Sequence, residues 1–155
     1  MIDNPLFDVE QLPPFSKIQA DHVEPAIDQL LSDARTALSK QLSGLEKPSW
    51  ATLVEPIESR DDQLNKAWSP VSHLHAVCNN DELRTAYSAG VAKLTEYGTE
   101  LGQNKDLFNA YQALASSPEF ASLNCAQQRS VNDAIRNFKL AGVDLAEDKQ
   151  DQYGE

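Results

Sequence analysis

The sequence predicts an all-α fold, a multi-helix antiparallel bundle, and three observations support this prediction. Apolar residues recur at steps of three and four through most of the 155 residues, which is the period of amphipathic helices. No segment of useful length alternates strictly between apolar and polar residues, as a half-buried strand would. Asparagine, serine or glycine stands where one periodic segment gives way to the next, as expected at helix ends. We therefore expect a single helical domain over residues 1–155.

The first 20 residues are predicted to form an extended arm (residues 1–20). They show no sustained apolar period, and Pro5, Pro13 and Pro14 disfavour a helix there. The apolar side chains that can anchor such an arm across a larger body are Leu6, Phe7, Leu12, Phe15 and Ile18.

A first helix is predicted to begin near Asp21 to Glu24, two acidic residues with the spacing of a capping box. Pro25 fits this helix only if it starts close by, because proline lacks the N–H that later turns require. One apolar face then continues to the region of Gly44. It consists of Val23, Ile27, Leu30, Leu31, Ala34, Leu38, Leu42 and Leu45.

The second helix is predicted to begin at Ser49 as its N-cap and to be kinked around Pro56 to Pro70. Both prolines lie inside one apolar stripe, and each removes a backbone donor from the helix. We expect either one long helix with kinks or two helical segments in series.

A third helix should follow a turn and cap at Asn79 to Asp81 and end at Gly102. Gly90 and Gly98 lie inside it, where each glycine weakens a helix by roughly 1 kcal/mol relative to alanine. Such a cost is usually accepted where another helix or backbone approaches closely. We therefore expect close approaches at both glycines.

Two shorter helices are predicted after this, with Asn104 and Asn124 as their N-caps and Gly142 as the end of the second. Residues 144–155 again open with capping-box spacing and continue a helical phase for only two or three turns. We interpret them as the start of a truncated helix that belongs to a longer protein.

Charge and cysteine content narrow the possible partners. The formal charge is -11 and the pI about 4.6, with acidic residues spread along the chain. Such a surface repels phosphate backbones and anionic lipid, so neither nucleic acid nor a membrane is an expected partner. The two cysteines, Cys78 and Cys125, fit a reducing compartment, and we predict a cytoplasmic protein.

Two of the three histidines lie in the stretch AWSPVSHLHAVCN, but their spacing argues against a metal site. His73 and His75 are two residues apart, roughly 200° around a helix, so they cannot bind one ion together. His75 and Cys78 can share a face, yet a zinc site needs three or four ligands. A half-buried histidine is the favoured interpretation, and no cofactor is expected in this chain.

Other chemistry remains open at this stage. An acidic band on the second helix contains paired carboxylates, which support acid-base catalysis only inside a buried pocket; a solvated face is favoured. The band consists of Glu55, Glu58, Asp61 and Asp62. Tyr97 and Tyr111 either pack in the core or face a groove and contact a peptide. No residue is assigned as catalytic.

Eight segments, in order from Asn4 to Tyr153, carry a family resemblance. They are NPLF, LPPF, IQADHVEPAIDQLL, PSWATLVEPIE, AWSPVSHLHAVCN, LTEYGTELGQN, LFNAYQALASSPEF and FKLAGVDL. Together they resemble the N-terminal part of the bacterial oligopeptidase A branch of the thimet-oligopeptidase-like zinc metallopeptidases. The resemblance covers almost the whole chain.

The resemblance implies a cytoplasmic, largely helical parent enzyme with two lobes around a channel that admits short peptides. It implies that zinc is held by a His-Glu-x-x-His helix and a downstream glutamate in the C-terminal catalytic lobe, far beyond this chain. No catalytic or metal-binding residue is therefore carried over. The residues considered for the channel wall are His73, His75, Tyr97 and Tyr111.

These observations favour a non-catalytic N-terminal domain of a zinc metallo-oligopeptidase, inactive alone, whose partners are the catalytic lobe and short peptide substrates. An exposed docking face also predicts self-association of the isolated domain. The alternative is a stand-alone helical module that binds a partner helix or peptide. A hydrolase based on the acidic band ranks below both.

Overall fold

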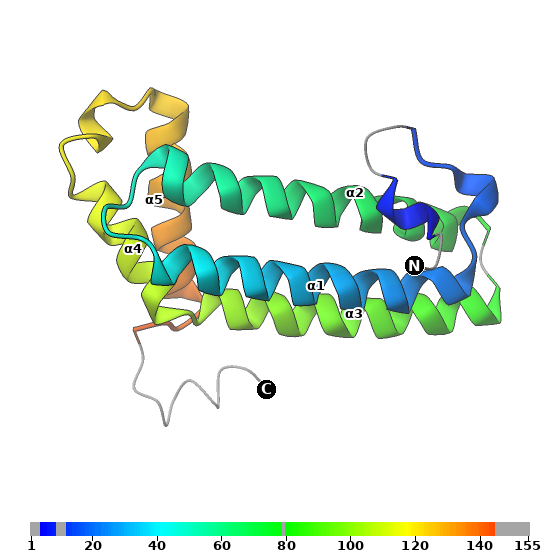
Figure 1. Cartoon of the computed structure of the whole chain (residues 1–155). Helices are drawn as coiled ribbons and strands as arrows, with labels where there is room; N and C mark the ends of the chain where they lie inside the picture. Colours follow the sequence, from blue (N-terminus) through cyan, green and yellow to red (C-terminus); the bar gives the residue numbers. More distant parts are fainter. Residues whose placement is uncertain (1–3, 9–11, 79, 145–155) are drawn as a thin grey trace. The chain divides into compact units, whose positions relative to one another are not determined.

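Helices make up most of the chain in the computed structural model, which describes residues 4–8, 12–78 and 80–144. No strand occurs within these ranges, so the all-α prediction is confirmed (Figure 1). The α-helices are α1 (Ala20–Ser43), α2 (Glu55–Val77), α3 (Asp81–Gly102), α4 (Lys105–Ala115) and α5 (Cys125–Leu140). The shorter elements are the 3-10 turns η1 (Pro5–Phe7), η2 (Phe15–Lys17) and η4 (Phe120–Ser122) and the π-helical turn η3 (Trp50–Val54).

The arm is fixed at its start by Asn4, a buried polar residue. Its side-chain oxygen accepts a hydrogen bond from the Leu6 backbone N–H at 3.0 Å, and its Nδ2 donates to the His22 carbonyl at 2.7 Å. The described parts of the arm contain η1 and η2, while residues 1–3 and 9–11 lie outside the described ranges.

Helix α1 begins at Ala20, so Asp21 lies in its first turn and is not the N-cap that its spacing with Glu24 predicted. The reason is that another side chain serves the helix start: His22 Nδ1 accepts a hydrogen bond from the Gln19 backbone N–H at 3.1 Å. Pro25 lies inside the helix, six residues into it.

The second helical region consists of η3 and α2, and Pro70 lies inside α2, which continues unbroken to Val77. The kink around Pro56 to Pro70 stays a prediction. Ser49 caps η3 through a capping box with Thr52, and η3 leads directly into α2. Pro56 cannot donate to the Thr52 carbonyl four residues before it. The Gln41 side chain donates to that carbonyl instead, at 2.7 Å, and to the Leu53 carbonyl at 3.0 Å.

Asparagine caps precede the last three helices, as predicted. The backbone N–H three residues after each asparagine bonds the asparagine side-chain oxygen, at 2.7 Å for Asn80, 2.9 Å for Asn104 and 2.9 Å for Asn124. Helix α5 ends at Leu140, with Ala141 as its C-cap, and Gly142 follows with a φ of 81°, a conformation that favours glycine. The predicted helix over 144–155 falls on residues of which only Asp144 is described.

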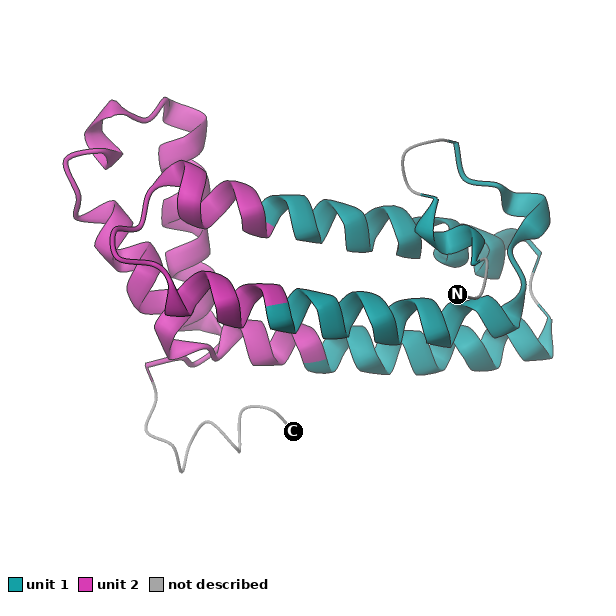
Figure 2. Ribbon diagram, viewed as in Figure 1, with its two compact units in different colours: residues 1–36, 58–96 teal, residues 37–57, 97–155 magenta. Residues whose placement is uncertain are grey.

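The chain forms two compact units (Figure 2). Unit 1 contains residues 1–36 and 58–96, and unit 2 contains residues 37–57 and 97–155. Helices α1, α2 and α3 contribute segments to both. The predicted single domain over 1–155 stays a prediction.

Within unit 1, the segment of α2 runs antiparallel to the segments of α1 and α3 (Figures 1 and 2). Lys93 of α3 forms ion pairs with Glu24 and Asp28 of α1, at 3.1 and 2.7 Å. Trp68 of α2 stacks on Tyr87 of α3, with ring centroids 5.1 Å apart. The buried apolar residues are small or aliphatic: Leu6, Ile18, Val23, Ala26, Ile27, Leu31, Ala34, Ala67, Val71, Leu83 and Ala86.

The two glycines inside α3 differ. A Cβ on Gly90 would lie 2.6 Å from the Trp68 ring, so this glycine does mark a close approach. A Cβ on Gly98 would meet no atom within 4 Å, apart from its own helix backbone and chain neighbours. The predicted close approach at Gly98 is therefore wrong, because this position faces open space.

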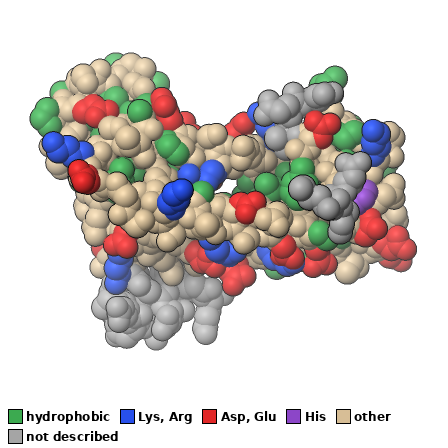
Figure 3. Space-filling view, in the orientation of Figure 1, with side chains coloured by type: hydrophobic (Ala, Val, Ile, Leu, Met, Phe, Trp, Pro, Cys, Tyr) green, Lys and Arg blue, Asp and Glu red, His purple; other side chains and the backbone are tan. Residues whose placement is uncertain are grey.

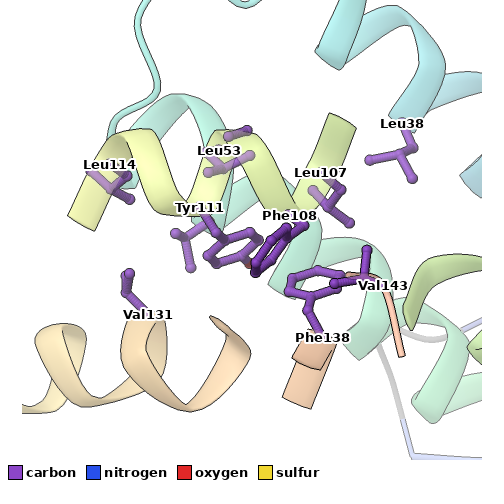
Figure 4. Packing of buried hydrophobic residues seen from close by; sticks show 11 residues of the cluster. Leu38, Leu53, Leu107, Phe108, Tyr111, Leu114, Val131, Phe138 and Val143 are labelled. Carbon is purple, nitrogen blue, oxygen red and sulfur yellow. The ribbon is translucent and has the colours of Figure 1, made fainter. Parts of the chain in front are cut away.

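Unit 2 has a core that contains aromatic side chains. The ring of Phe138 in α5 packs against two rings of α4, with centroids 5.9 Å from Phe108 and 5.6 Å from Tyr111 (Figure 4). The turn η3 is tied to the α4–α5 region by a 3.0 Å hydrogen bond from the Trp50 N–H to Glu119 Oε1. The core residues are Leu38, Leu53, Val54, Leu107, Phe108, Ala110, Tyr111, Leu114, Val131, Phe138 and Val143.

Candidate functional site

The two histidines of α2 have different surroundings. His73 is exposed, and its ring lies 5.3 Å from that of Phe15 in the arm at 55°. His75 is half-buried and stacks on Tyr87, with centroids 3.9 Å apart and 7° between the planes. The structure does not bring them together, as their spacing predicted. His73 lines a hollow that is described below.

Tyr87 also stacks on Trp68, so its ring contacts two rings of α2. Trp68 and His75 are seven residues apart, two turns along one helix face. This stack was missed at the sequence level because Tyr87 belongs to another helix.

Tyr97 and Tyr111, the other two residues considered for a peptide channel, are both buried. Tyr111 packs on Phe138 in the unit 2 core. That these two tyrosines or the histidines line a channel stays a prediction.

The described residues do not fit zinc. They contain no group of three or more His, Cys, Asp or Glu side chains placed to hold a metal ion. His75 contacts Tyr87 through its ring face, and Cys78 is an exposed free thiol. No step of chemistry is assigned to a metal in this chain.

The acidic band of α2 lies on exposed positions. Asp62 pairs with Lys66 at 2.7 Å. Crowding of the Asp61 carboxyl by the surrounding protein raises its pKa above 3.8, and Arg60 opposes this rise. The three hollows described below are not lined by Asp61 or Asp62. The band fits a solvated face better than a catalytic pair.

A groove of about 500 Å³ lies in unit 1 between the arm and α2. The arm lines it with Leu6, Asp8 and Phe15 among others. From α2 it takes Lys66, Ser69, Pro70 and His73, which share one helix face at steps of three and four. The sequence did not predict this groove, because it did not show where the arm lies on the helices. The prolines and apolar anchors of the arm were the features that could have indicated a binding surface.

Two further hollows are shallower. One, in unit 2, lies where α1 ends and the next loop begins, between Lys40 and Thr52. The other, in unit 1, lies between the start of α1 and the first turns of α3 and is lined by Asp21, Glu24 and Glu82. Neither hollow brings together side chains in an arrangement typical of a catalytic or metal-binding site.

The surface is predominantly acidic, in line with the net charge of -11. On the face viewed in Figure 3, acidic side chains are interspersed with basic ones, and apolar side chains appear near the arm. No helix of the described residues is long and apolar enough to span a membrane.

Comparison with known proteins gives consistent matches. The protein-family model described as the neurolysin/thimet oligopeptidase N-terminal domain matches residues 27–150. Oligopeptidase A of Haemophilus influenzae is 43% identical over 156 residues, which cover 99% of this chain and 22% of that protein. Oligopeptidase A of Salmonella typhimurium is 42% identical over 152 residues, covering 98% and 22%. A probable cytosolic oligopeptidase A of Arabidopsis thaliana is 37% identical over 150 residues, covering 97% and 21%. The chain spans about a fifth of the length of these relatives.

Proposed function

The chain belongs to the family of neurolysin and thimet oligopeptidase N-terminal domains, and from this premise we propose that it is the non-catalytic N-terminal lobe of a zinc peptidase that cleaves short peptides. The observation that carries the proposal is the match of nearly the whole chain to about a fifth of much longer proteins, together with a family model that is described as an N-terminal domain. The catalytic lobe of the same protein is its proposed partner.

In this proposal the domain forms part of the wall of a substrate channel and limits the size of the peptides that enter. The helical unit 1 is suited to that role because side chains carried on helices are positioned more precisely than side chains on loops. Of the residues considered, His73 is the exposed one and His75 is half-buried. We also propose a cytoplasmic location, supported by the similarity to a relative named as probably cytosolic.

The first test is enzymatic. The purified chain, with zinc in excess and a fluorogenic short peptide, should give no turnover above a control without protein. A longer protein whose coding sequence continues into a His-Glu-x-x-His helix should cleave the same peptide. Turnover by the chain alone, or a longer protein without peptidase activity, would overturn the proposal.

The channel wall is tested by cysteine accessibility in the longer protein. His73→Cys and His75→Cys are made in a background where Cys78 and Cys125 are serine, and maleimide labelling is followed with and without a slowly cleaved peptide. Bound peptide should slow labelling at the histidine positions and leave a cysteine at the exposed Ser88 unaffected. Equal labelling rates at the histidine positions with and without peptide would contradict the channel-wall role.

A further inference from the structure

The groove between the arm and α2 has the size and lining of a recognition site for a few side chains. Its volume of about 500 Å³ lies within the range of ligand-binding hollows, roughly 300–1,000 Å³. Four prolines line it: Pro5, Pro13, Pro14 and Pro70. Because each has a fixed φ, these walls have little conformational entropy to lose when a ligand binds.

Several exposed apolar side chains belong to the arm, which forms one wall of this groove. Phe7, Leu12 and Phe15, all in the arm, are three of the six large hydrophobic residues that are exposed in the described chain, and Leu12 is 91% exposed. Phe15 is also part of the lining, where its ring meets that of His73. The groove therefore offers a ligand an exposed aromatic ring.

The charges in the groove favour a basic ligand. The ammonium group of Lys66 lies 2.7 Å from Asp62, which offsets its charge. Asp8 lines the groove, is exposed, and forms no ion pair within the described ranges. With a net charge of -11 on the chain, the surroundings attract cations at long range.

We propose that this groove binds a cationic peptide segment, with an apolar side chain among the prolines and Phe15 and a neighbouring lysine or arginine at Asp8. The inference goes beyond the proposed peptidase role, since it concerns binding by this chain without any catalytic lobe. It is therefore tested on the chain itself, and its outcome is independent of whether the longer protein is a peptidase.

The direct test is fluorescence polarisation with a labelled octapeptide that carries a leucine-phenylalanine pair between lysines. We expect a dissociation constant below about 1 mM at low salt and weaker binding at about 0.3 M salt, where screening is stronger. Replacing the lysines by glutamates, or the leucine-phenylalanine pair by alanines, should each weaken binding about tenfold. Absence of binding at 1 mM, or equal affinity for the glutamate peptide, would overturn the proposal.

Two variants with matched controls locate the binding. Ser69→Trp fills the groove from α2 and should abolish binding, whereas Ser88→Trp places the same side chain at an exposed position of α3 outside the groove. Asp8→Asn should weaken binding about fivefold, and Glu96→Gln, with the same change in net charge, less than twofold. Circular dichroism establishes that each variant is folded. Equal losses in a variant and its control would place the peptide elsewhere and refute the assignment.

Discussion

Unit 1 and unit 2 are stabilised by different kinds of side-chain contact. The buried residues of unit 1 are mostly alanine, valine, isoleucine and leucine, and its aromatic rings lie at half-buried or exposed positions. In unit 2 the rings of Phe108, Tyr111 and Phe138 are buried, and the Phe138 ring contacts the other two.

Because of this difference, the large residues that pack a core and the residues available for binding lie in different units. Buried aromatic side chains contribute large areas of apolar contact, so unit 2 depends on a few large residues. Small residues and Gly90 let the helices of unit 1 approach closely, and Phe15 and His73 stay at the surface beside a groove. The residues that offer chemistry for binding are therefore in the unit with the small-residue core.

The largest expected effect is in unit 2. Phe138→Ala removes the ring that contacts both Phe108 and Tyr111, and should lower the free energy of unfolding by about 3–5 kcal/mol. Leu140→Ala, two residues later and 63% exposed, should change it by less than about 0.5 kcal/mol. Urea denaturation followed by circular dichroism measures both. Similar losses in the two variants would contradict the central role of the aromatic cluster.

In unit 1 the corresponding test is Gly90→Ala. The new methyl group would meet the Trp68 ring at 2.6 Å, so this ring or the helices must shift, at a cost of about 1–3 kcal/mol. The double variant Gly90→Ala with Trp68→Leu removes the clash, and its loss should be smaller than the sum of the two single losses. Strict additivity would show that the Gly90–Trp68 contact does not limit the approach of α2 and α3.

The junction of η3 and α2 gives a third test, because Gln41 donates to the Thr52 carbonyl, which Pro56 cannot reach with an N–H, and also to the Leu53 carbonyl. Gln41→Leu keeps the approximate size of the side chain but removes the donor to the Thr52 and Leu53 carbonyls. The expected loss is about 0.5–1.5 kcal/mol in the free energy of unfolding. Gln29→Leu, which removes only an exposed side-chain hydrogen bond to Asp33, serves as control and should cost less than about 0.5 kcal/mol. A Gln41→Leu loss no larger than that of the control would show that these hydrogen bonds do not stabilise the junction.

Local signals in the sequence were sufficient for the fold class and most helix ends. Ser49, Asn104 and Asn124 cap the helices they were predicted to cap, because capping depends on residues only three positions apart. The N-cap of α1 was predicted wrongly, at Asp21. At the start of α1 the Gln19 backbone N–H donates to the His22 ring, and histidine is not among the residues preferred at helix N-termini. The family resemblance, which rests on whole segments, is confirmed.

Contacts between distant segments could not be predicted in the same way. Neither the groove nor the Tyr87 stack follows from the order of residues, because each depends on which helix face meets which neighbour. For the same reason Gly90 and Gly98 look alike in sequence, although only Gly90 faces another side chain.

This contrast between the glycines predicts a stabilising substitution. Gly98 is exposed, lies inside α3 and has no positive φ, so Gly98→Ala adds no clash and removes flexibility from the unfolded chain. The free energy of unfolding should rise by about 0.5–1 kcal/mol. The substitution Gly142→Ala, at φ 81°, should have the opposite sign and cost about 1 kcal/mol. A decrease in stability for Gly98→Ala would indicate a close contact at Gly98.

The smallest effect concerns the ion pairs of unit 1. Lys93→Met removes the pairs with Glu24 and Asp28 and should cost about 0.2–1 kcal/mol at low salt, because these groups are partly exposed. Lys47→Met, at an exposed loop position with no ion pair in the described chain, should cost less.

The pH dependence of the same pairs has a definite sign. The hydrogen bond to Asp28, aided by Glu24, holds the pKa of Lys93 above its ordinary 10.5, although partial burial acts in the opposite direction. A group whose pKa is raised by folding contributes stability in full below its unfolded pKa and loses it as the pH rises through the folded value. The difference in unfolding free energy between wild type and Lys93→Met should therefore be constant near neutral pH and shrink above about 10.5. A difference that grows with alkaline pH would show that the ammonium group does not link α1 to α3.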